Sequence, residues 1–347
     1  LLLGANASGK STVLEVLDMI SRIASSDGED VSKAISCKSR TRWANKETQR
    51  FELEFSVPLG TYIYTLWIRN DSSQDKIRIE KEKLQVGELT IFEISGGSAH
   101  FYSDTNGNPH VSSLISDKYS IFTNPRSLDI LRDQFLAESY FRDIICARIT
   151  PAIILAESRD SVSKASINMS DFASWYSHLL QEKPEIISEL LASLKAVLPG
   201  FQSLAMPGIE DFRQLKVKMQ MLAEQGKTVS DFLFTELSDG QKMLVVLYTL
   251  LHNLNDQSIL CIDEPDNYIS LQEIEPWLHA LEDKVDDTGA QCLIISHHPE
   301  LIDRLAVDCG IYFYRENNGP VRTKRFENTL KDNLSASELV ARGWENE

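Results

Sequence analysis

The sequence predicts an α/β protein with a mostly parallel core sheet, an antiparallel β subdomain and a helical lobe. Three observations lead to this prediction. Strand and helix patterns alternate after residue 238, which is typical of parallel strands joined by crossover helices. Residues 51–70 alternate and are rich in β-branched and aromatic side chains, which indicates a hairpin. Residues 170–200 carry apolar side chains at helical spacing.

The N-terminal half begins with a strand, a loop and a helix within residues 1–24. Five apolar residues repeat at helical spacing in that helix, namely Val13, Leu14, Val16, Leu17 and Ile20. Residues 76–122 suggest further short strands, 127–147 a helix, and 151–156 another short strand. Because the chain opens on Leu1-Leu2-Leu3 with no initiator Met, we expect that residues preceding this strand are missing.

The C-terminal half is more regular. Pro184 fits the first turn of the second of two amphipathic helices, and Pro199-Gly200 ends that helix. The apolar residues of 215–235 follow neither the helical nor the strand spacing clearly. The elements that follow are predicted as helix 239–254, strand 258–262, helix 271–285, strand 290–295, helix 299–306 and strand 310–314.

Length and composition are those of an ordinary globular chain. The 347 residues exceed twice the usual ~150 per domain, so one large domain with insertions or two domains both fit. Apolar residues make up 42% and charged residues 25%, which argues against disorder. No apolar run approaches the roughly 20 residues that a membrane helix needs, so we expect no membrane partner.

Charge is unevenly distributed along the chain. The net charge is −16, and residues 201–300 carry 17 acidic and 6 basic side chains. Residues 38–50 instead carry five basic side chains and one acidic, with Trp43 among them. An acidic protein is not a general polyanion binder, so any contact with nucleic acid has to be a local patch.

The cysteine pattern indicates the cellular compartment of the protein. The chain has five scattered cysteines: Cys37, Cys146, Cys261, Cys292 and Cys309. Their number is odd and no C-x-x-C pair occurs, so neither a disulfide framework nor a zinc site is indicated. We therefore expect a reducing, cytoplasmic location.

The glycine-rich run from Gly4 to Ser11 fits the pattern G-x-x-x-x-G-K-[ST] between an apolar strand and a helix. Backbone N–H groups of such a loop and the helix N-terminus form an anion cradle. Lys10 adds a positive charge for the phosphates, and the Ser11 hydroxyl suits Mg²⁺. The alternative is a glycine turn with a chance lysine.

A second apolar run, residues 258–262, ends in Asp263-Glu264-Pro265. Ligands of α/β sheets sit at the carboxyl ends of strands, so these acids suit a metal site. We expect Asp263 to hold Mg²⁺ and Glu264 to polarise a water molecule. The alternative is an exposed acidic turn.

Two more polar positions lie at the end of a predicted strand or the start of a predicted helix, where ligands bind. His297 lies at the end of the strand predicted over 290–295, where it could contact a phosphate or the attacking water. Ser238-Asp239-Gly240 opens a long apolar helix, which makes a second anion site or an ordinary N-cap. One chain cannot easily aim two helix N-termini at one phosphate from opposite sides, whereas two chains can.

These four runs together resemble the ATP-binding-cassette-type head. The sequence is most similar to AAA-family ATPases with an ABC-like core, found in bacterial phage-defence and overcoming-lysogenisation-like systems, and more distantly to RecF and SMC ATPases. The resemblance covers residues 1–24 and 231–314. It implies a P-loop NTPase with an N-terminal ATPase lobe over 1–150, a helical lobe or insert over 151–236, a C-terminal ATPase lobe over 237–325 and a tail over 326–347.

The resemblance also assigns roles to individual residues. The Walker A loop corresponds to Gly4, Asn6, Ala7, Ser8, Gly9, Lys10, Ser11 and Thr12, and the signature turn to Ser238 and Gly240. Asp263 matches the Walker B aspartate, Glu264 the catalytic glutamate and His297 the switch histidine. Tyr268 and Ser270 stand where the family usually has Gly and His, and no glutamine is assignable to the Q-loop.

The implied function is ATP hydrolysis with Mg²⁺ in a nucleotide-gated homodimer or higher oligomer. We expect the chain to sense or regulate a separate effector protein in bacterial anti-phage defence. The alternative is a DNA-repair or chromosome-associated ATPase, for which the basic stretch 38–50 is the support. A transporter subunit fits poorly, because Lys10 and Ser238 lie too far apart in sequence.

Overall fold

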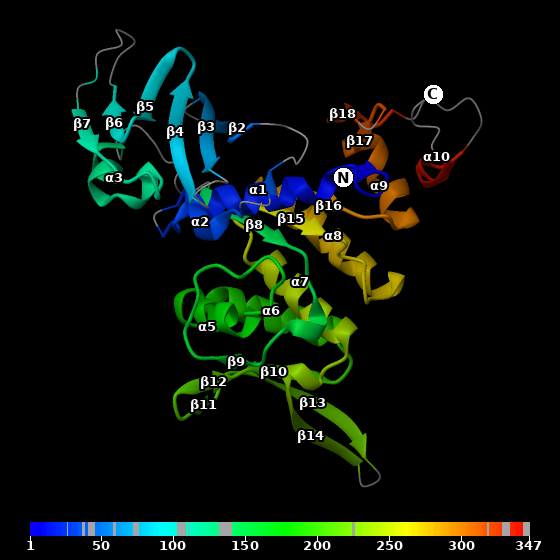
Figure 1. The fold of residues 1–347 in the computed structure, drawn as a ribbon. Helices are drawn as coiled ribbons and strands as arrows, with labels where there is room; N and C mark the ends of the chain where they lie inside the picture. The colour runs from blue at the N-terminus through cyan, green and yellow to red at the C-terminus, as the bar shows by residue number, and fades with distance from the viewer. Residues whose placement is uncertain are drawn as a thin grey trace. The chain divides into compact units, whose positions relative to one another are not determined.

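The computed structural model describes residues 1–25, 27–36, 39–40, 46–57, 60–71, 76–102, 109, 111–131, 141–223, 226–317, 319–327 and 334–342. Its internal contacts divide the chain into two compact units (Figure 1). Unit 1 comprises Leu1–Val16 and Ile144–Glu347, and unit 2 comprises Leu17–Asp143. Helix α1 (Lys10–Ile23) contributes to both. The lobe boundaries expected from the sequence stay a prediction.

Unit 1 is built on a six-stranded sheet in the order β18-β17-β1-β16-β15-β8. All neighbouring strands are parallel except β17 and β18, which form an antiparallel pair. The strands are β1 (Leu2–Gly4), β8 (Ile144–Ala147), β15 (Ile259–Asp263), β16 (Gln291–Ile295), β17 (Ile311–Arg315) and β18 (Val321–Arg325). The predicted mostly parallel α/β core is therefore confirmed.

Crossover helices link these strands: α7 (Asp239–His252), α8 (Leu271–Thr288) and α9 (Pro299–Cys309). Every side chain from Lys242 to Leu251 is buried, so α7 forms the centre of the unit's core. The Trp277 indole of α8 donates a 3.0 Å hydrogen bond to the Leu247 carbonyl, which attaches the two helices to each other. Gly289 ends α8 in the left-handed conformation.

Residues 151–237 of unit 1 contain helices and two small sheets. The helices are α5 (Phe172–Glu182) and α6 (Pro184–Val197), as the sequence predicts, with short 3₁₀ turns η3 (Pro151–Ile153) and η4 (Phe234–Glu236). One sheet has the order β10-β13-β14 and another β11-β12-β9. Their strands are β9 (Glu157–Ser158), β10 (Phe201–Ala205), β11 (Gly208–Ile209), β12 (Phe212–Gln214), β13 (Lys216–Ala223) and β14 (Gly226–Leu233).

Two elements differ from the sequence expectation. The helix predicted over 127–147 is wrong at its end, because Ile144–Ala147 is strand β8, paired in parallel with β15. The strand predicted over 151–156 is a 3₁₀ turn at its start. Pro151 lacks a backbone donor, and Ile153 and Leu155 are 44% and 59% exposed, so this apolar run is not a buried strand.

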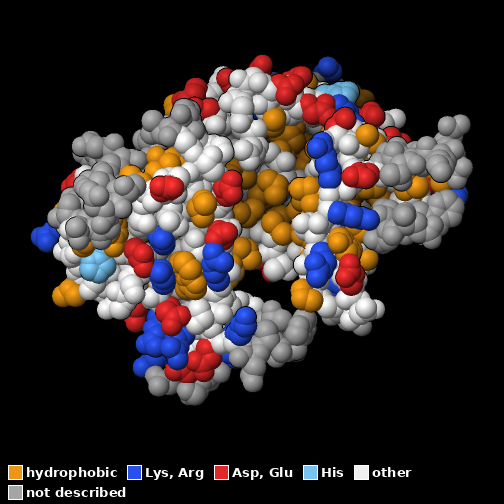
Figure 2. Space-filling view, turned by 90° about the horizontal axis from the view of Figure 1, so that it is seen from above, with side chains coloured by type: hydrophobic (Ala, Val, Ile, Leu, Met, Phe, Trp, Pro, Cys, Tyr) orange, Lys and Arg blue, Asp and Glu red, His pale blue; other side chains and the backbone are white. Residues whose placement is uncertain are grey.

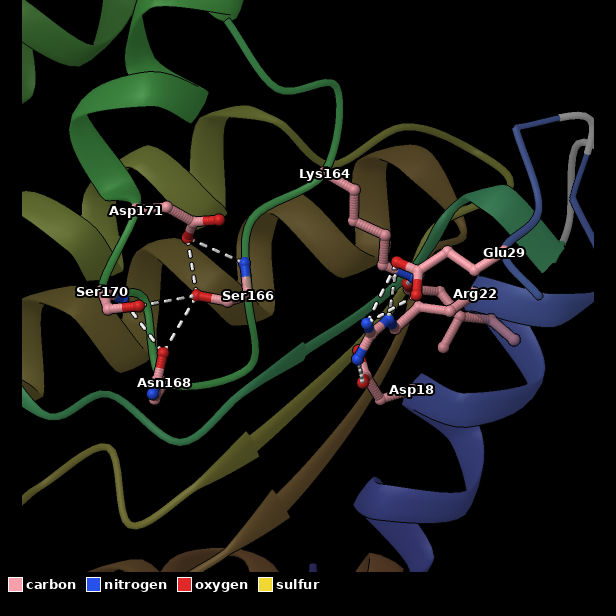
Figure 3. A network of polar contacts seen from close by, with 9 residues as sticks. Asp18, Arg22, Glu29, Lys164, Ser166, Asn168, Ser170 and Asp171 are labelled. Atoms are coloured by element: carbon pink, nitrogen blue, oxygen red, sulfur yellow. Dashed lines mark hydrogen bonds and ion pairs between the residues drawn. The ribbon is translucent and has the colours of Figure 1, made fainter. Parts of the chain in front are cut away.

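The loop before α5 is held by its own polar side chains (Figure 3). The Ser166 hydroxyl donates to Asp171 at 2.6 Å and to Asn168 at 2.9 Å, and the Ser170 N–H donates to Asn168. The Arg148 N–H donates to the Ile167 carbonyl at 2.6 Å, so this loop is fastened to the end of β8.

Unit 2 contains the predicted antiparallel subdomain, a six-stranded sheet in the order β2-β3-β4-β5-β6-β7. Its core includes the packed rings of Tyr64, Phe92, Phe122 and Phe141. Asp18 and Glu29 pair with Arg22 at the end of α1 (Figure 3). The elements are α2 (Val31–Ala34), β2 (Thr48–Val57), β3 (Gly60–Asp71), β4 (Lys76–Val86), β5 (Leu89–Ser95), β6 (Ser98–Phe101), β7 (Val111–Leu114), η2 (Ile121–Thr123) and α3 (Pro125–Leu131).

Part of the predicted tail is ordered as helix α10 (Ala336–Arg342), which packs against α9. Asp303 of α9 accepts hydrogen bonds from the N–H and the hydroxyl of Ser337, at 2.7 and 2.9 Å. Among the described helices, none is long and apolar enough to cross a bilayer.

Candidate nucleotide site

The glycine-rich loop joins the end of β1 to the start of α1. Gly4 has φ of +135°, and a Cβ there would lie 2.2 Å from the Phe313 carbonyl oxygen of β17, so only glycine fits. Ala7 and Gly9 also have positive φ, at +64° and +101°. The loop therefore curls back over the end of its own strand, the geometry of a phosphate cradle.

Two polar side chains of this loop are placed to bind a polyphosphate. Among the described residues, the Ser8 hydroxyl is buried and has no hydrogen-bond partner. The Lys10 ammonium donates to the carbonyls of Gly4 at 2.8 Å and Ala5 at 3.2 Å, groups of the loop itself. Burial lowers the pKa of Lys10, although Glu264 and Asp263 oppose that shift. Phosphate oxygens fit both donors.

The two predicted acids lie at the carboxyl end of β15. Asp263 is the last residue of that strand and is 8% exposed. Glu264 has φ of +55°, a conformation that non-glycine residues rarely adopt, and its N–H donates to the Ile295 carbonyl at 2.8 Å. Burial, followed by the charges of Asp266 and Asp263, raises the pKa of Glu264 to about 7. Such a carboxyl group is poised to exchange a proton near neutral pH.

The two adjacent histidines have different roles. His297 Nε2 lies 3.8 Å from Glu264 Oε1, and burial together with the Lys10 charge lowers the pKa of His297. His298 is the N-cap of α9, where its Nδ1 accepts from the Glu300 N–H at 3.3 Å. Only His297 therefore faces the loop and the acids.

One cavity of about 530 Å³ gathers predicted residues of the phosphate loop with both acids and His297. It is lined by Asn6, Ala7, Ser8, Gly9, Lys10, Ser11, Thr12, Asp263, Glu264, Ile295, His297 and Arg315. Gly4 lines a neighbouring cavity together with Asn6 and His297. The Ser11 hydroxyl, the Asp263 carboxylate and phosphate oxygens are the hard oxygen ligands that suit Mg²⁺.

The signature turn is not part of this cavity. Ser238 forms a capping box with Gln241 at the start of α7, in which each residue's side chain accepts from the other's N–H. A Cβ on Gly240 would lie 2.8 Å from the Tyr268 carbonyl oxygen, so Gly240 permits close approach of the loop that follows Glu264. Ser238 is exposed, which leaves it available to another molecule.

Two arginines of the site were missed by sequence reasoning. Arg148 Nε lies 2.9 Å from Asp263 Oδ2, and Arg148 Nη1 lies 3.4 Å from Glu15 Oε1. Arg315, at the end of β17, lines the cavity itself. No local pattern marks either residue. The order of strands in the sheet brings both residues to the site. For Arg315 alone the sequence offers a hint, because that residue directly follows the strand predicted over 310–314.

Arg148→Ala is expected to lower the free energy of unfolding by about 1–3 kcal/mol, because it leaves the mostly buried Asp263 carboxylate without its cation. If Asp263 holds Mg²⁺, as the sequence predicts, Mg·ATP supplies a replacement cation. The rise in Tm on adding Mg·ATP should therefore be larger in the variant than in the unmodified protein, as measured by scanning fluorimetry.

Arg304→Ala is the matched control, since it removes an ion pair with Glu282 away from the cavity. This control variant should lose little stability. Its Tm should rise on adding Mg·ATP by as much as the Tm of the unmodified protein does. If Arg148→Ala also showed an unmodified shift, the link between Arg148 and the metal position would be wrong.

A strand–loop–helix phosphate cradle, with acidic strand ends beside it in a parallel sheet, defines a P-loop NTPase fold. The family model described as "AAA domain, putative AbiEii toxin, Type IV TA system" matches residues 1–303, and the chain belongs to this family. No curated protein matches the chain.

Several solved structures are distantly similar to the chain. One is an SmcHead bound to the C-winged helix domain of ScpA, with 14% identity and a TM-score of 0.44 over 95% of this chain and 91% of that one. Another is the SMC head domain from Thermotoga maritima, with 15% identity and a TM-score of 0.42 over 94% and 89% of the two chains. A third is an Smc head with coiled coil and joint derived from Pyrococcus yayanosii, with 15% identity and a TM-score of 0.35 over 51% and 32%.

Proposed function

We propose that the chain hydrolyses ATP with Mg²⁺ and works as a nucleotide-gated dimer switch. The observation that carries the proposal is that the signature turn lies outside the cavity lined by the phosphate loop and the acids. Lys10 and the acids line one cavity, whereas the exposed N-terminus of α7 at Ser238 lies outside it. Two chains facing each other would place Ser238 of one chain against the phosphates held by the other.

The residues of the cavity suit hydrolysis by water. Backbone N–H groups of the loop and the Lys10 ammonium would bind and orient the phosphates. Ser11 and Asp263 would hold Mg²⁺, which neutralises charge on the phosphates when bound. Glu264, with its raised pKa, would orient the attacking water and accept its proton, and His297 would contact the terminal phosphate from beside Glu264.

The composite site is tested by mixing two variants that are each inactive. Lys10→Ala removes the positive charge that binds the phosphates. Ser238→Arg blocks the signature turn. In a mixed dimer, one site combines the intact Lys10 of one chain with the intact Ser238 of the other. We expect each variant alone to show no ATP hydrolysis and the mixture to recover part of it. No recovery would contradict a site shared between chains.

We further propose that the switch regulates a separate effector protein in anti-phage defence. The family description, which names a toxin and a toxin–antitoxin system, is compatible with such a role. Helix α8 follows the acidic strand end and exposes Glu273, Glu275, Asp283, Asp286 and Asp287. An acidic surface of this kind suits a basic partner.

DNA binding is a second candidate, favoured by one feature of unit 2. The Arg50 guanidinium and the Lys81 ammonium lie 5.5 and 5.2 Å from the centre of the Trp67 ring. Arg40 of the basic stretch is described, whereas Arg42 and Trp43 lie outside the described residues. On the face drawn in Figure 2, basic side chains are interspersed with acidic ones.

If unit 2 binds DNA, affinity should fall as salt rises, because binding releases counterions. The double variant Arg50→Glu and Lys81→Glu should then bind at least roughly 10-fold more weakly at low salt. Fluorescence anisotropy with a labelled duplex measures both effects. Lys195→Glu, on the exposed face of α6, is the control. Absence of binding at low salt would remove DNA as a partner.

A further inference from the structure

We propose that Arg315 is the second cationic nucleotide-binding residue of the site, on the side of the α- and β-phosphates. The inference rests on the proposed function, because it assumes that the cavity binds a nucleoside triphosphate. Arg315 is the only residue of the β17–β18 hairpin that lines the cavity, among the residues the structure describes there. It matches none of the motifs in the sequence.

The order of the strands places Arg315 opposite the acids. Strand β1, which leads into the phosphate loop, pairs with β16 on one side and with β17 on the other. Asp263 and Glu264 end β15 beyond β16, and His297 follows β16. Arg315 ends β17 at the same edge of the sheet. The phosphate loop therefore lies between the acids and Arg315.

This arrangement orients a bound triphosphate. Ser11 and Asp263 would hold Mg²⁺ and Glu264 would orient water, all beside the terminal phosphate, so that phosphate would point toward β16 and β15. The remaining phosphates then extend toward β17. A guanidinium there meets the α- and β-phosphates and lies away from the bond that hydrolysis breaks.

The negative charge in the cavity favours a second cationic residue there. Asp263 and Glu264 add negative charge beside a ligand that is itself strongly anionic. Lys10 is the only other Lys or Arg among the residues lining the cavity. Arginine suits the position because its planar fork donates to two phosphate oxygens at once.

The hairpin holds Arg315 in place. Arg315 Nη1 donates to the Gly319 carbonyl at 2.9 Å, which uses one of five donors and leaves the others for a ligand. A Cβ on Gly9 would lie 3.1 Å from Val321 Cγ2 of β18, so the hairpin packs directly against the phosphate loop. Arg315 is thus carried by an element in contact with the cradle.

Isothermal titration calorimetry with Mg²⁺ and either ADP or a non-hydrolysable ATP analogue tests the assignment. Arg315→Ala should weaken both ligands by roughly 10- to 100-fold, because the lost charge-assisted hydrogen bonds involve phosphates that both ligands share. Arg315→Lys should recover part of the affinity, since a point charge remains. Arg315 is exposed, so we expect the Tm without nucleotide to be unchanged.

Arg322→Ala is the matched control, because Arg322 lies on the same hairpin, contacts Glu316 and does not line the cavity. It should bind both ligands normally. Unchanged affinity for ADP in Arg315→Ala would overturn the assignment, as would a loss confined to the ATP analogue, which would place Arg315 at the terminal phosphate. If the unmodified protein bound neither ligand, the proposed function itself would fail.

Discussion

Lys10→Ala is expected to abolish nucleotide binding at concentrations where the unmodified protein is saturated. Lys10 is the only charged side chain of the phosphate loop and is 6% exposed, so its ammonium acts where water screens it little. In the structure it donates to the Gly4 and Ala5 carbonyls, which places it at the centre of the cradle. We expect the affinity for Mg·ATP to fall by at least ~100-fold, measured by calorimetry.

Lys164→Ala is the matched control, because Lys164 also donates to a backbone carbonyl, that of Ile144, but does not line the cavity. It should bind ATP normally. Circular dichroism of Lys10→Ala should match the unmodified protein, which separates loss of binding from loss of fold. Unmodified ATP affinity in a folded Lys10→Ala protein would contradict the assignment of the loop.

Glu264→Gln is expected to keep ATP binding and to lower the rate of hydrolysis by roughly 10²- to 10⁴-fold. Glutamine keeps the size of the side chain but cannot accept a proton from water. The burial that raises the pKa of Glu264 to about 7 makes its carboxylate a stronger base than an exposed glutamate, so its loss should be costly. Phosphate release at saturating ATP measures the rate.

The same variant tests dimerisation, because bound ATP that is not hydrolysed should hold two chains together. Light scattering should show a larger mass with Mg·ATP than without it. Glu275→Gln, on the exposed face of α8, should hydrolyse ATP normally and serves as the control. A mass that nucleotide leaves unchanged, whether that of a monomer or a preformed oligomer, would refute the ATP-driven switch.

The strand–loop–helix cradle and the alternating elements after residue 238 were predictable from the sequence because their signals are local. Gly9 and Lys10 follow an apolar strand within ten residues, and α7 is a long, nearly continuous apolar run in which every side chain from Lys242 to Leu251 is buried. The acids at the end of β15 and the histidine after β16 were found in the same way, each at the end of an apolar run.

Short or exposed elements could not be predicted with the same means. The four residues of β8 are apolar without a clear period, and only their pairing with β15, more than a hundred residues later in the chain, makes them a strand. Hairpin β13–β14 could not be predicted from the sequence, because most of β14 is exposed and no alternation of burial marks it. In both, tertiary contacts outweigh local preference.

The residue types of the nucleotide site were thus determined by the sequence alone, through glycines and a lysine that a phosphate loop requires and acids that end apolar strands. The tertiary structure decided which strands are neighbours. By placing β17 beside β1, and β8 beside β15, it brought Arg315 into the cavity and Arg148 onto Asp263. No spacing along the chain encodes these contacts, because strand order is set by packing between segments that are distant in sequence.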